Sequence, residues 1–96
     1  MEITKEIGFD TVVAQANGLV AVDMDGEKVM LNIEKGKYYG LDGIGSRIWE
    51  LLEKPHTVRE VVAALLEEYD VEEKTCQCDV LAFLNNLHSQ RLVDID

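Results

Sequence analysis

Basic residues are scarce in this chain: 9 lysines and arginines stand against 19 aspartates and glutamates, giving a formal net charge of −10. Nucleic acids and anionic membrane surfaces are bound through clusters of lysine and arginine, so this balance argues against both as partners. No apolar run approaches the roughly 20 residues that span a bilayer, and residues 1–6 hold no apolar signal region. We therefore expect a soluble, cytoplasmic protein with no nucleic-acid or membrane partner.

Cysteine is rarer still, with two residues in the chain. Cys76 and Cys78 are too close in sequence to form a disulfide framework. A metal site is not indicated either, because His56 and His88 are single and no second Cys/His pair exists. The pair is predicted to be two small, partly buried side chains near a helix start.

The length of 96 residues predicts a single domain over residues 1–96, and the 47% apolar fraction supplies one modest core. The single proline is Pro55, and no glycine follows Gly45. This distribution predicts an α+β fold with a strand-rich first half and a helical second half. Residues 1–17 are expected to be partly irregular.

Three short apolar segments indicate strands. Residues 18–24 precede Asp25-Gly26, which is a strong signal for a two-residue hairpin turn. Residues 28–33 follow, with Val29, Leu31 and Ile33 on one face, and a turn at 34–36 leads into residues 37–42. The pattern predicts a three-stranded antiparallel meander, and residues 11–15 offer a further short strand.

Three helices are predicted after the strands. The first begins at Asp42 as N-cap and ends near Lys54, because Pro55 disfavours helical geometry in the residue before it. The second begins with the capping-box sequence Thr57-Val58-Arg59-Glu60 and ends in an acidic stretch at 67–73. The third runs from Glu73 or Thr75 to about Gln90, and residues 92–95 are expected to cover the end of the core.

A three-stranded meander with three short helices is the inventory of a winged helix-turn-helix domain. Many such domains bind DNA through the last helix, but fold alone does not decide function. Between Glu60 and Gln90 the only fixed positive charge is Lys74. A recognition helix of this composition would repel phosphates, so DNA binding is kept only as an alternative.

No catalytic arrangement emerges from the sequence. The glycines of Gly40-x-x-Gly43-x-Gly45 lack the spacing and the lysine of a phosphate-binding loop, and they predict a strand-to-helix turn with close backbone approach. Ser46 and Ser89 have no basic partner at a recognisable spacing. A chain of this length also has little room for a pocket of several hundred cubic ångström. We therefore expect a binding module without enzymatic activity and without a cofactor.

An ordered set of segments resembles the PqqD-like family. They are Val29-Met30-Leu31-Asn32, Lys37-Tyr38-Tyr39-Gly40-Leu41-Asp42, Gly45-Ser46-Arg47-Ile48-Trp49-Glu50-Leu51-Leu52, Thr57-Val58-Arg59-Glu60-Val61-Val62, Tyr69, Asp79-Val80-Leu81-Ala82-Phe83-Leu84-Asn85-Asn86-Leu87 and Leu92-Val93. The resemblance covers about residues 19–95 and is strongest to the small stand-alone members of lasso-peptide biosynthesis. It implies a winged helix-turn-helix protein that binds the leader of a ribosomally synthesised precursor peptide. It also implies a separate leader protease as a partner.

The resemblance places the bound leader beside the third strand, where an exposed edge accepts an additional strand. On the last helix, the wholly aliphatic Val80 and Leu84 suit the core, which leaves the opposite flank for the groove. The predicted peptide-binding residues are Lys37, Tyr38, Tyr39, Gly40, Leu41, Asp42, Asp79, Phe83 and Asn86.

Other interpretations of these residues stay open. Either tyrosine could simply support the sheet, and Phe83 could be plain core. Lys35 and Lys37 could attract an acidic leader, although lysines on edge strands commonly block unwanted pairing. The acidic stretch 67–73 either keeps the protein soluble or faces a basic protease surface.

Two alternatives from other classes are a winged-helix transcription regulator and a scaffolding subunit of an enzyme complex. A monomer is as compatible with the sequence as a dimer that exchanges strands or helices. Two positions depart from the family pattern. Asp42 stands where the family often has asparagine, and either residue can cap the following helix. Arg91 stands where a glycine often precedes the final Leu-Val. Arginine there weakens the expectation of a left-handed cap at the end of the last helix.

Overall fold

The computed structural model of the chain describes residues 7–25 and 27–95. Residues 1–6 of the region expected to be partly irregular, and Gly26 of the expected hairpin turn, lie outside this description. The elements are β1 (Val12–Gln15), β2 (Leu19–Met24), β3 (Glu27–Asn32), β4 (Lys37–Gly40), α1 (Gly43–Leu51), β5 (His56–Thr57), α2 (Val58–Glu68), α3 (Glu73–Ser89) and β6 (Val93–Ile95). None of the described helices is long and apolar enough to cross a bilayer.

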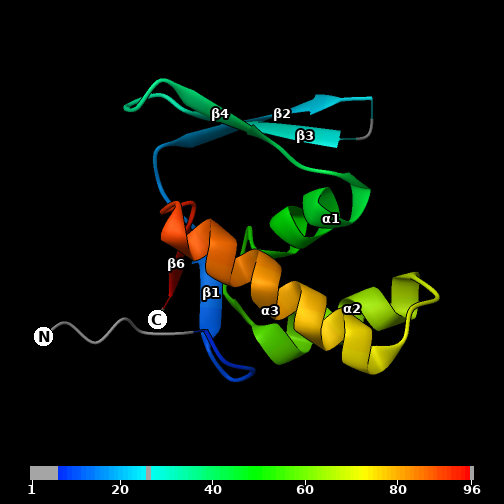
Figure 1. Ribbon diagram of the computed structural model, residues 1–96. Helices are drawn as coiled ribbons and strands as arrows, with labels where there is room; N and C mark the ends of the chain where they lie inside the picture. Colours follow the sequence, from blue (N-terminus) through cyan, green and yellow to red (C-terminus); the bar gives the residue numbers. More distant parts are fainter. Residues whose placement is uncertain (1–6, 26, 96) are drawn as a thin grey trace, which may run out of the picture.

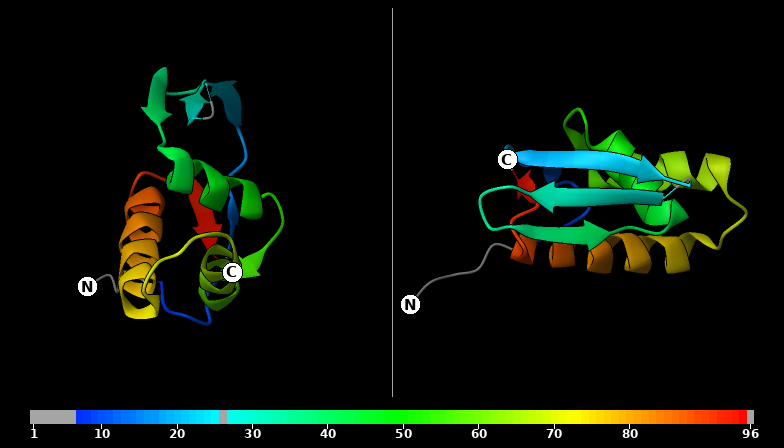
Figure 2. Two further views of the ribbon diagram at one scale, coloured as in Figure 1. Left: turned by 90° about the vertical axis from the view of Figure 1, so that its right-hand side faces the viewer. Right: turned by 90° about the horizontal axis from the view of Figure 1, so that it is seen from above.

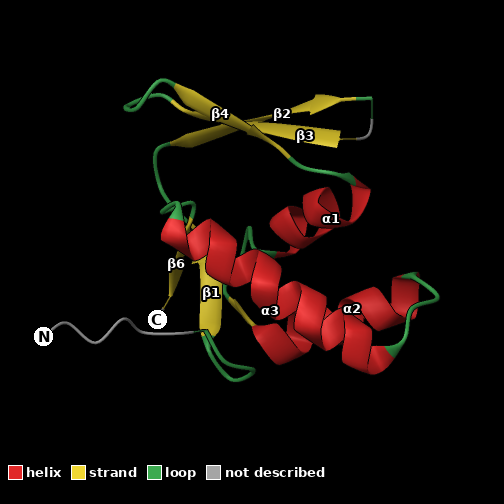
Figure 3. Cartoon of the chain, viewed as in Figure 1, coloured by secondary structure: helices red, strands yellow, loops and turns green. Residues whose placement is uncertain are grey.

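The predicted α+β winged-helix architecture is confirmed. Strands β2, β3 and β4 form an antiparallel meander in that order, and three helices follow in the second half of the chain (Figures 1 and 3). The meander forms a layer of its own next to α1, whereas α2 and α3 pack on the far side of α1 (Figure 2). β4 is the edge strand on the side of α3.

A second sheet was not predicted. The segment at residues 11–15 does form a strand, but β1 pairs with β5 and β6 and not with the meander. Val12 lies opposite Thr57 and Val13 opposite Ile95, so this sheet joins both ends of the chain to the connection between α1 and α2. Buried Leu92 and Val93 close the core at its end, as expected for the tail.

Local capping signals set the helix boundaries. The Asp42 carboxylate accepts a hydrogen bond of 2.6 Å from the Gly45 amide at the start of α1, as predicted. Thr57 and Glu60 form the predicted capping box at the start of α2. The acidic stretch separates α2 from α3, because Tyr69 already has an extended backbone.

The end of α3 differs from the expectation. Arg91 adopts a left-handed conformation with a φ of 61°, although it carries a side chain. The Leu92 amide bonds to the Leu87 carbonyl at 2.9 Å and the Arg91 amide to that of His88 at 3.0 Å, the two bonds of a Schellman cap. The buried Leu92 and Val93 that follow hold the chain in this cap.

The face of the meander that carries Leu31 and Ile33 is not the one buried against the helices. Met30 is fully buried, whereas Leu31 and Ile33 are exposed. The register places Met30 opposite Tyr39, and Leu31 opposite both Val20 and Tyr38. Tyr39 and Met30 therefore face the helices, while the face with Leu31 points away from them.

A buried serine connects the meander to α1. The Ser46 hydroxyl accepts a hydrogen bond of 2.8 Å from the Lys28 amide and donates one of 3.4 Å to the Leu41 carbonyl. Ser46 is the one buried polar residue among those that the structure describes. Its hydroxyl holds β3 and the end of β4 against α1, and so fixes the wall of the cavity described next.

Candidate functional site

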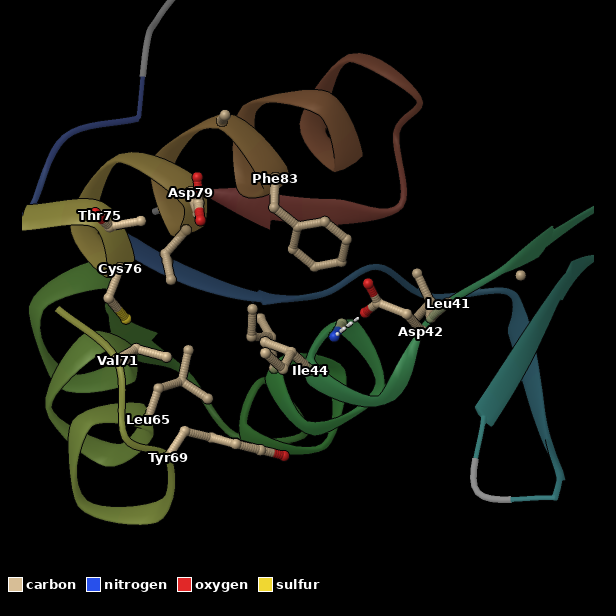
Figure 4. A pocket seen from close by; sticks show the side chains of 15 residues that line it. Leu41, Asp42, Ile44, Leu65, Tyr69, Val71, Thr75, Cys76, Asp79 and Phe83 are labelled. Atoms are coloured by element: carbon tan, nitrogen blue, oxygen red, sulfur yellow. Dashed lines mark hydrogen bonds between the residues drawn. The ribbon is translucent and has the colours of Figure 1, made fainter. Parts of the chain in front are cut away.

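A cavity of about 510 Å³ opens between the end of β4 and the three helices (Figure 4). Such a volume lies within the range of about 300–1,000 Å³ found for ligand sites, so the expectation that so short a chain lacks room for one is wrong. Its walls are mostly apolar. They are lined by Gly40, Leu41, Asp42, Ile44, Gly45, Ile48, Leu65, Tyr69, Val71, Thr75, Cys76, Asp79, Val80, Ala82 and Phe83.

The free edge of β4 borders this cavity. The Leu41 amide bonds to the Lys28 carbonyl at 2.8 Å, and the cross-strand pairs continue from there through Tyr39 with Met30. In an antiparallel ladder the residues whose backbone groups point at the partner strand alternate along the chain. The N–H and C=O groups of Tyr38 and Gly40 therefore point away from β3, toward an edge that has no strand beside it in the described part of the chain.

Five of the nine predicted peptide-binding residues line the cavity. Gly40, Leu41 and Asp42 form its wall at the end of β4, and Asp79 and Phe83 form its wall on α3. The aromatic ring of Phe83 points from α3 toward Asp42 (Figure 4). Sequence positions 40 and 83, far apart in the chain, thus meet at one opening.

The other four predicted residues lie outside the cavity lining. Tyr38 is 73% exposed on the outer face of the sheet, whereas Tyr39 is half-buried against the core. Lys37 is exposed at the start of β4, and Asn86 is exposed one helical turn beyond Phe83. Their assignment to peptide binding stays a prediction, as it does for the five residues that line the cavity.

Gly45 brings α1 close to α3 beside the opening. A Cβ atom at this position would lie 3.2 Å from Cζ of Phe83 and 3.0 Å from the Asp42 carboxylate. Glycine therefore permits the Phe83 ring to pack against the first turn of α1. The predicted close backbone approach within the glycine-containing turn is confirmed at Gly45.

Several cavity residues were not predicted from the sequence. Ile44, in the first turn of α1, is 42% exposed and faces the cavity. Tyr69 and Val71 arrive from the loop between α2 and α3, and Cys76 from the first turns of α3 (Figure 4). The exposed Val71 inside an otherwise acidic loop was a signal that the sequence did offer.

The two cysteines are free and differ in burial. Cys76 is buried at the cavity wall, and burial together with nearby Asp79 raises the pKa of its thiol. The thiol is therefore held in its neutral form and serves as apolar lining. Within residues 7–25 and 27–95, no three Cys, His, Asp or Glu side chains gather in a way that would hold a metal ion.

An ion pair fixes the position of α1 against α2 behind the cavity. The guanidinium of Arg47 contacts both carboxylate oxygens of Glu68 at 2.8 Å. This two-pronged geometry lowers the pKa of Glu68 and raises that of Arg47. The helices that carry Ile44 and Leu65 are thereby held in one arrangement.

A winged-helix domain with a free strand edge beside an apolar groove is the class that this geometry defines. Residues 27–93 match the family described as Coenzyme PQQ synthesis protein D (PqqD), and the chain therefore belongs to the PqqD family. The resemblance seen in the sequence is confirmed. A comparison with curated proteins finds no match.

Two solved structures share the fold. TbiB1 in complex with the TbiA(beta) leader peptide is 37% identical, with a TM-score of 0.78 over 84% of this chain and 94% of TbiB1. A lasso peptide synthetase B1 complexed with its leader peptide is 22% identical, with a TM-score of 0.76 over 85% of this chain and 96% of the other. The second likeness shows the fold alone. The aligned region includes 94% and 96% of these two chains, so each of them consists of little beyond the shared fold.

Proposed function

We propose that the chain, as one domain, is a non-catalytic adaptor that binds the leader of a ribosomally synthesised precursor peptide by strand addition. It then presents the leader to a separate leader protease in the cytoplasmic assembly of a lasso peptide. The observation that carries this proposal is the free edge of β4, which opens directly onto the cavity. The 37% identity to TbiB1, a protein in complex with a leader peptide, supports it.

Strand addition explains why the edge and the cavity lie together. A leader strand paired with the outward N–H and C=O groups of Tyr38 and Gly40 continues the meander as a fourth strand. Its side chains alternate between the two faces of the enlarged sheet. One set enters the cavity on the side of Leu41 and Phe83, and the other joins the outer face beside Tyr38.

The chemistry of the cavity indicates the leader side chains that it accepts. The walls are aliphatic and aromatic, and the two charged residues in the lining, Asp42 and Asp79, are both acidic. Apolar side chains are buried there favourably, whereas an acidic side chain would lose hydration and meet like charge. The leader residues that enter the cavity are therefore apolar, with neutral or basic neighbours.

The alternatives are weaker on this structure. A DNA-binding regulator would use α3, whose single fixed positive charge is Lys74 and whose first turn carries Glu73. The net charge of −10 also repels DNA phosphates at long range, which further disfavours DNA binding. A scaffolding subunit would need neither a free edge nor a cavity beside it.

A fluorescence-polarisation titration tests the proposal. The probes are a fluorescein-labelled TbiA(beta) leader peptide, the leader of this chain's own precursor, and a labelled DNA duplex at about 150 mM salt. We expect saturable binding of its own leader, and duplex affinity no better than the ~10⁻⁴–10⁻⁶ M of non-specific binders. Absence of leader binding, or cleavage of the precursor by the purified protein alone, would refute the adaptor.

A further inference from the structure

The meander has a second free edge, on the side away from α3. Its strand order ends on β2, and in the described part of the chain no strand pairs with the other side of β2 (Figure 2). The Lys28 carbonyl bonds to β4, so the next residue of β3, Val29, directs its backbone groups at Val22 of β2. The alternation leaves the N–H and C=O groups of Ala21 and Asp23 pointing outward along the free edge.

Strand β2 lacks the features that usually keep an edge strand from pairing. It holds no proline and no lysine, and its register with β3 runs without a bulge over all six residues from Leu19 to Met24. Its one charged residue, Asp23, is bound by the Lys28 ammonium at 2.7 Å. An exposed edge of this kind is a template on which a further strand can add.

A polar concavity of about 440 Å³ lies beneath this edge, between the meander and α1. Its lining includes Gln15, Ala21, Lys28, Arg47, Glu50 and Glu53. It shares no lining residue with the cavity beside β4. Ala21 lies opposite the buried Met30, so its small side chain is on the face of β2 that looks toward the helices. A residue of an added strand opposite Ala21 would point to the same side, into the concavity.

Carboxylates outnumber cations in this concavity. The Lys28 ammonium is already paired, at 2.7 Å from Asp23 and 3.8 Å from Glu50. The Arg47 guanidinium is likewise held by carboxylates. Glu53 is exposed and has no ion-pair partner among the residues that the structure describes. A basic side chain that enters the concavity is therefore attracted, whereas an acidic one is repelled.

A second copy of this chain fits the edge poorly. Two β2 strands paired about Ala21 would bring two concavities with exposed Glu50 and Glu53 toward each other. Each copy also carries a net charge of −10, and like charges oppose association. A basic segment of a different polypeptide meets neither obstacle.

We propose that the β2 edge and the concavity beneath it bind an extended segment of another protein that has lysine or arginine at alternate positions. The segment adds as a strand along the outward backbone groups of Ala21 and Asp23. Its basic side chains point toward Glu50 and Glu53, and the intervening side chains lie beside the half-exposed Val22, where apolar residues are favoured. This site lies across the meander from β4, so one chain has room for a leader and for this segment at the same time.

The test is fluorescence polarisation with a fluorescein-labelled peptide of about seven alternating valines and lysines, long enough to span one strand. An isomer with contiguous lysines and a peptide with glutamate in place of lysine are the comparison probes. Ala21→Pro removes an outward N–H without removing a bond of the meander, and Tyr38→Pro is the matched change on the β4 edge. Glu53→Lys reverses a charge in the concavity, and Glu67→Lys makes the same change on the exposed surface of α2.

We expect saturable binding of the alternating lysine peptide and weaker binding of both comparison probes. Ala21→Pro should weaken binding roughly 5- to 150-fold, as expected for one hydrogen-bonding group left unpaired. Glu53→Lys should weaken it by about 3- to 10-fold. Tyr38→Pro and Glu67→Lys should stay within about 2-fold of wild type.

Four results would overturn the proposal. They are absence of binding by the wild type, equal affinity for the contiguous isomer, a loss in Tyr38→Pro as large as in Ala21→Pro, and a loss in Glu67→Lys as large as in Glu53→Lys. Thermal unfolding first shows that each variant is folded, and the two lysine variants decide the matter if Ala21→Pro does not fold. Leader affinity is measured separately, so failure to bind leader would refute the proposed function and leave this site in place.

Discussion

Replacing Tyr38 with proline separates the backbone of β4 from its side chains. The Tyr38 amide points away from β3, so proline there removes no hydrogen bond of the meander. Edge strands accept proline at such positions. Under the proposed function, this amide donates to a carbonyl of the bound leader. The substitution therefore removes one intermolecular hydrogen bond while keeping the fold.

The expected loss follows from the leader carbonyl that stays unpaired. A polar group that is desolvated without a partner costs about 1–3 kcal/mol, which weakens binding by roughly 5- to 150-fold. Tyr38→Ala keeps the amide and removes a side chain that is 73% exposed on the outer face, away from the cavity. We expect it to change leader affinity by about 2-fold or less.

The assay is fluorescence polarisation with the labelled leader, after thermal unfolding has shown that each variant is folded. Tyr39→Pro is the structural control, because the Tyr39 amide pairs with β3 and its loss should lower the melting temperature markedly. Equal affinities of Tyr38→Pro and wild type would refute strand addition at β4. A loss of equal size in Tyr38→Ala would assign the effect to the side chain.

Four further predictions concern the body of the protein. Ser46→Ala leaves the partly buried Lys28 amide of β3 unpaired and should destabilise the fold by about 1 kcal/mol in chemical denaturation. Arg91→Gly relieves a left-handed φ of 61° and should stabilise by about 0.5–1 kcal/mol. In a Cys78→Ser background, bound leader should slow alkylation of Cys76 at the cavity wall. The ion pair with Arg47 lowers the pKa of Glu68 in the folded state. The stabilisation by this ion pair is therefore full above the ordinary pKa of about 4.5 and is lost as pH falls through the folded-state pKa. Glu68→Gln should flatten the acid side of the profile of stability against pH.

Each of these has a result that contradicts it. An unchanged denaturation midpoint for Ser46→Ala would mean that water replaces the hydroxyl. A lower melting temperature for Arg91→Gly would show that the arginine side chain stabilises the cap. Alkylation of Cys76 at the same rate with saturating leader would place the peptide outside the cavity. An identical acid profile for Glu68→Gln would mean that the ion pair contributes nothing measurable.

The sequence by itself determined the helix boundaries and the meander. Capping signals act over three or four residues, so Asp42 and Thr57 mark the starts of α1 and α2 without knowledge of the rest of the fold. Pro55 indicated an end near Lys54, whereas α1 ends at Leu51. The ordered segments at 37–42 and 79–87 also carried the family resemblance, and with it the strand edge and helix proposed to form the site. The net charge of −10 by itself argues against nucleic acid as a partner.

Only the tertiary structure decided which face of the meander is buried. Strand β3 carries apolar side chains on both faces, so alternation did not distinguish Met30 from Leu31. Contact with α1 buries Met30 and leaves the face with Leu31 and Ile33 in solvent. Pairing of β1 with β5 and β6 was equally invisible, because residues such as Val13 and Ile95 are far apart in the chain.

The cavity depends most strongly on long-range packing. Its walls bring together the end of β4, α1, the α2–α3 connection and α3, and no spacing in the sequence encodes that meeting. The left-handed backbone conformation of Arg91 also depends on long-range packing. Local preference disfavours that conformation by roughly 1–2 kcal/mol, and burial of Leu92 and Val93 in the core overrides it. Short-range signals thus set where the elements begin and end, whereas burial of apolar surface between distant segments decided which of their faces and edges stay available for binding.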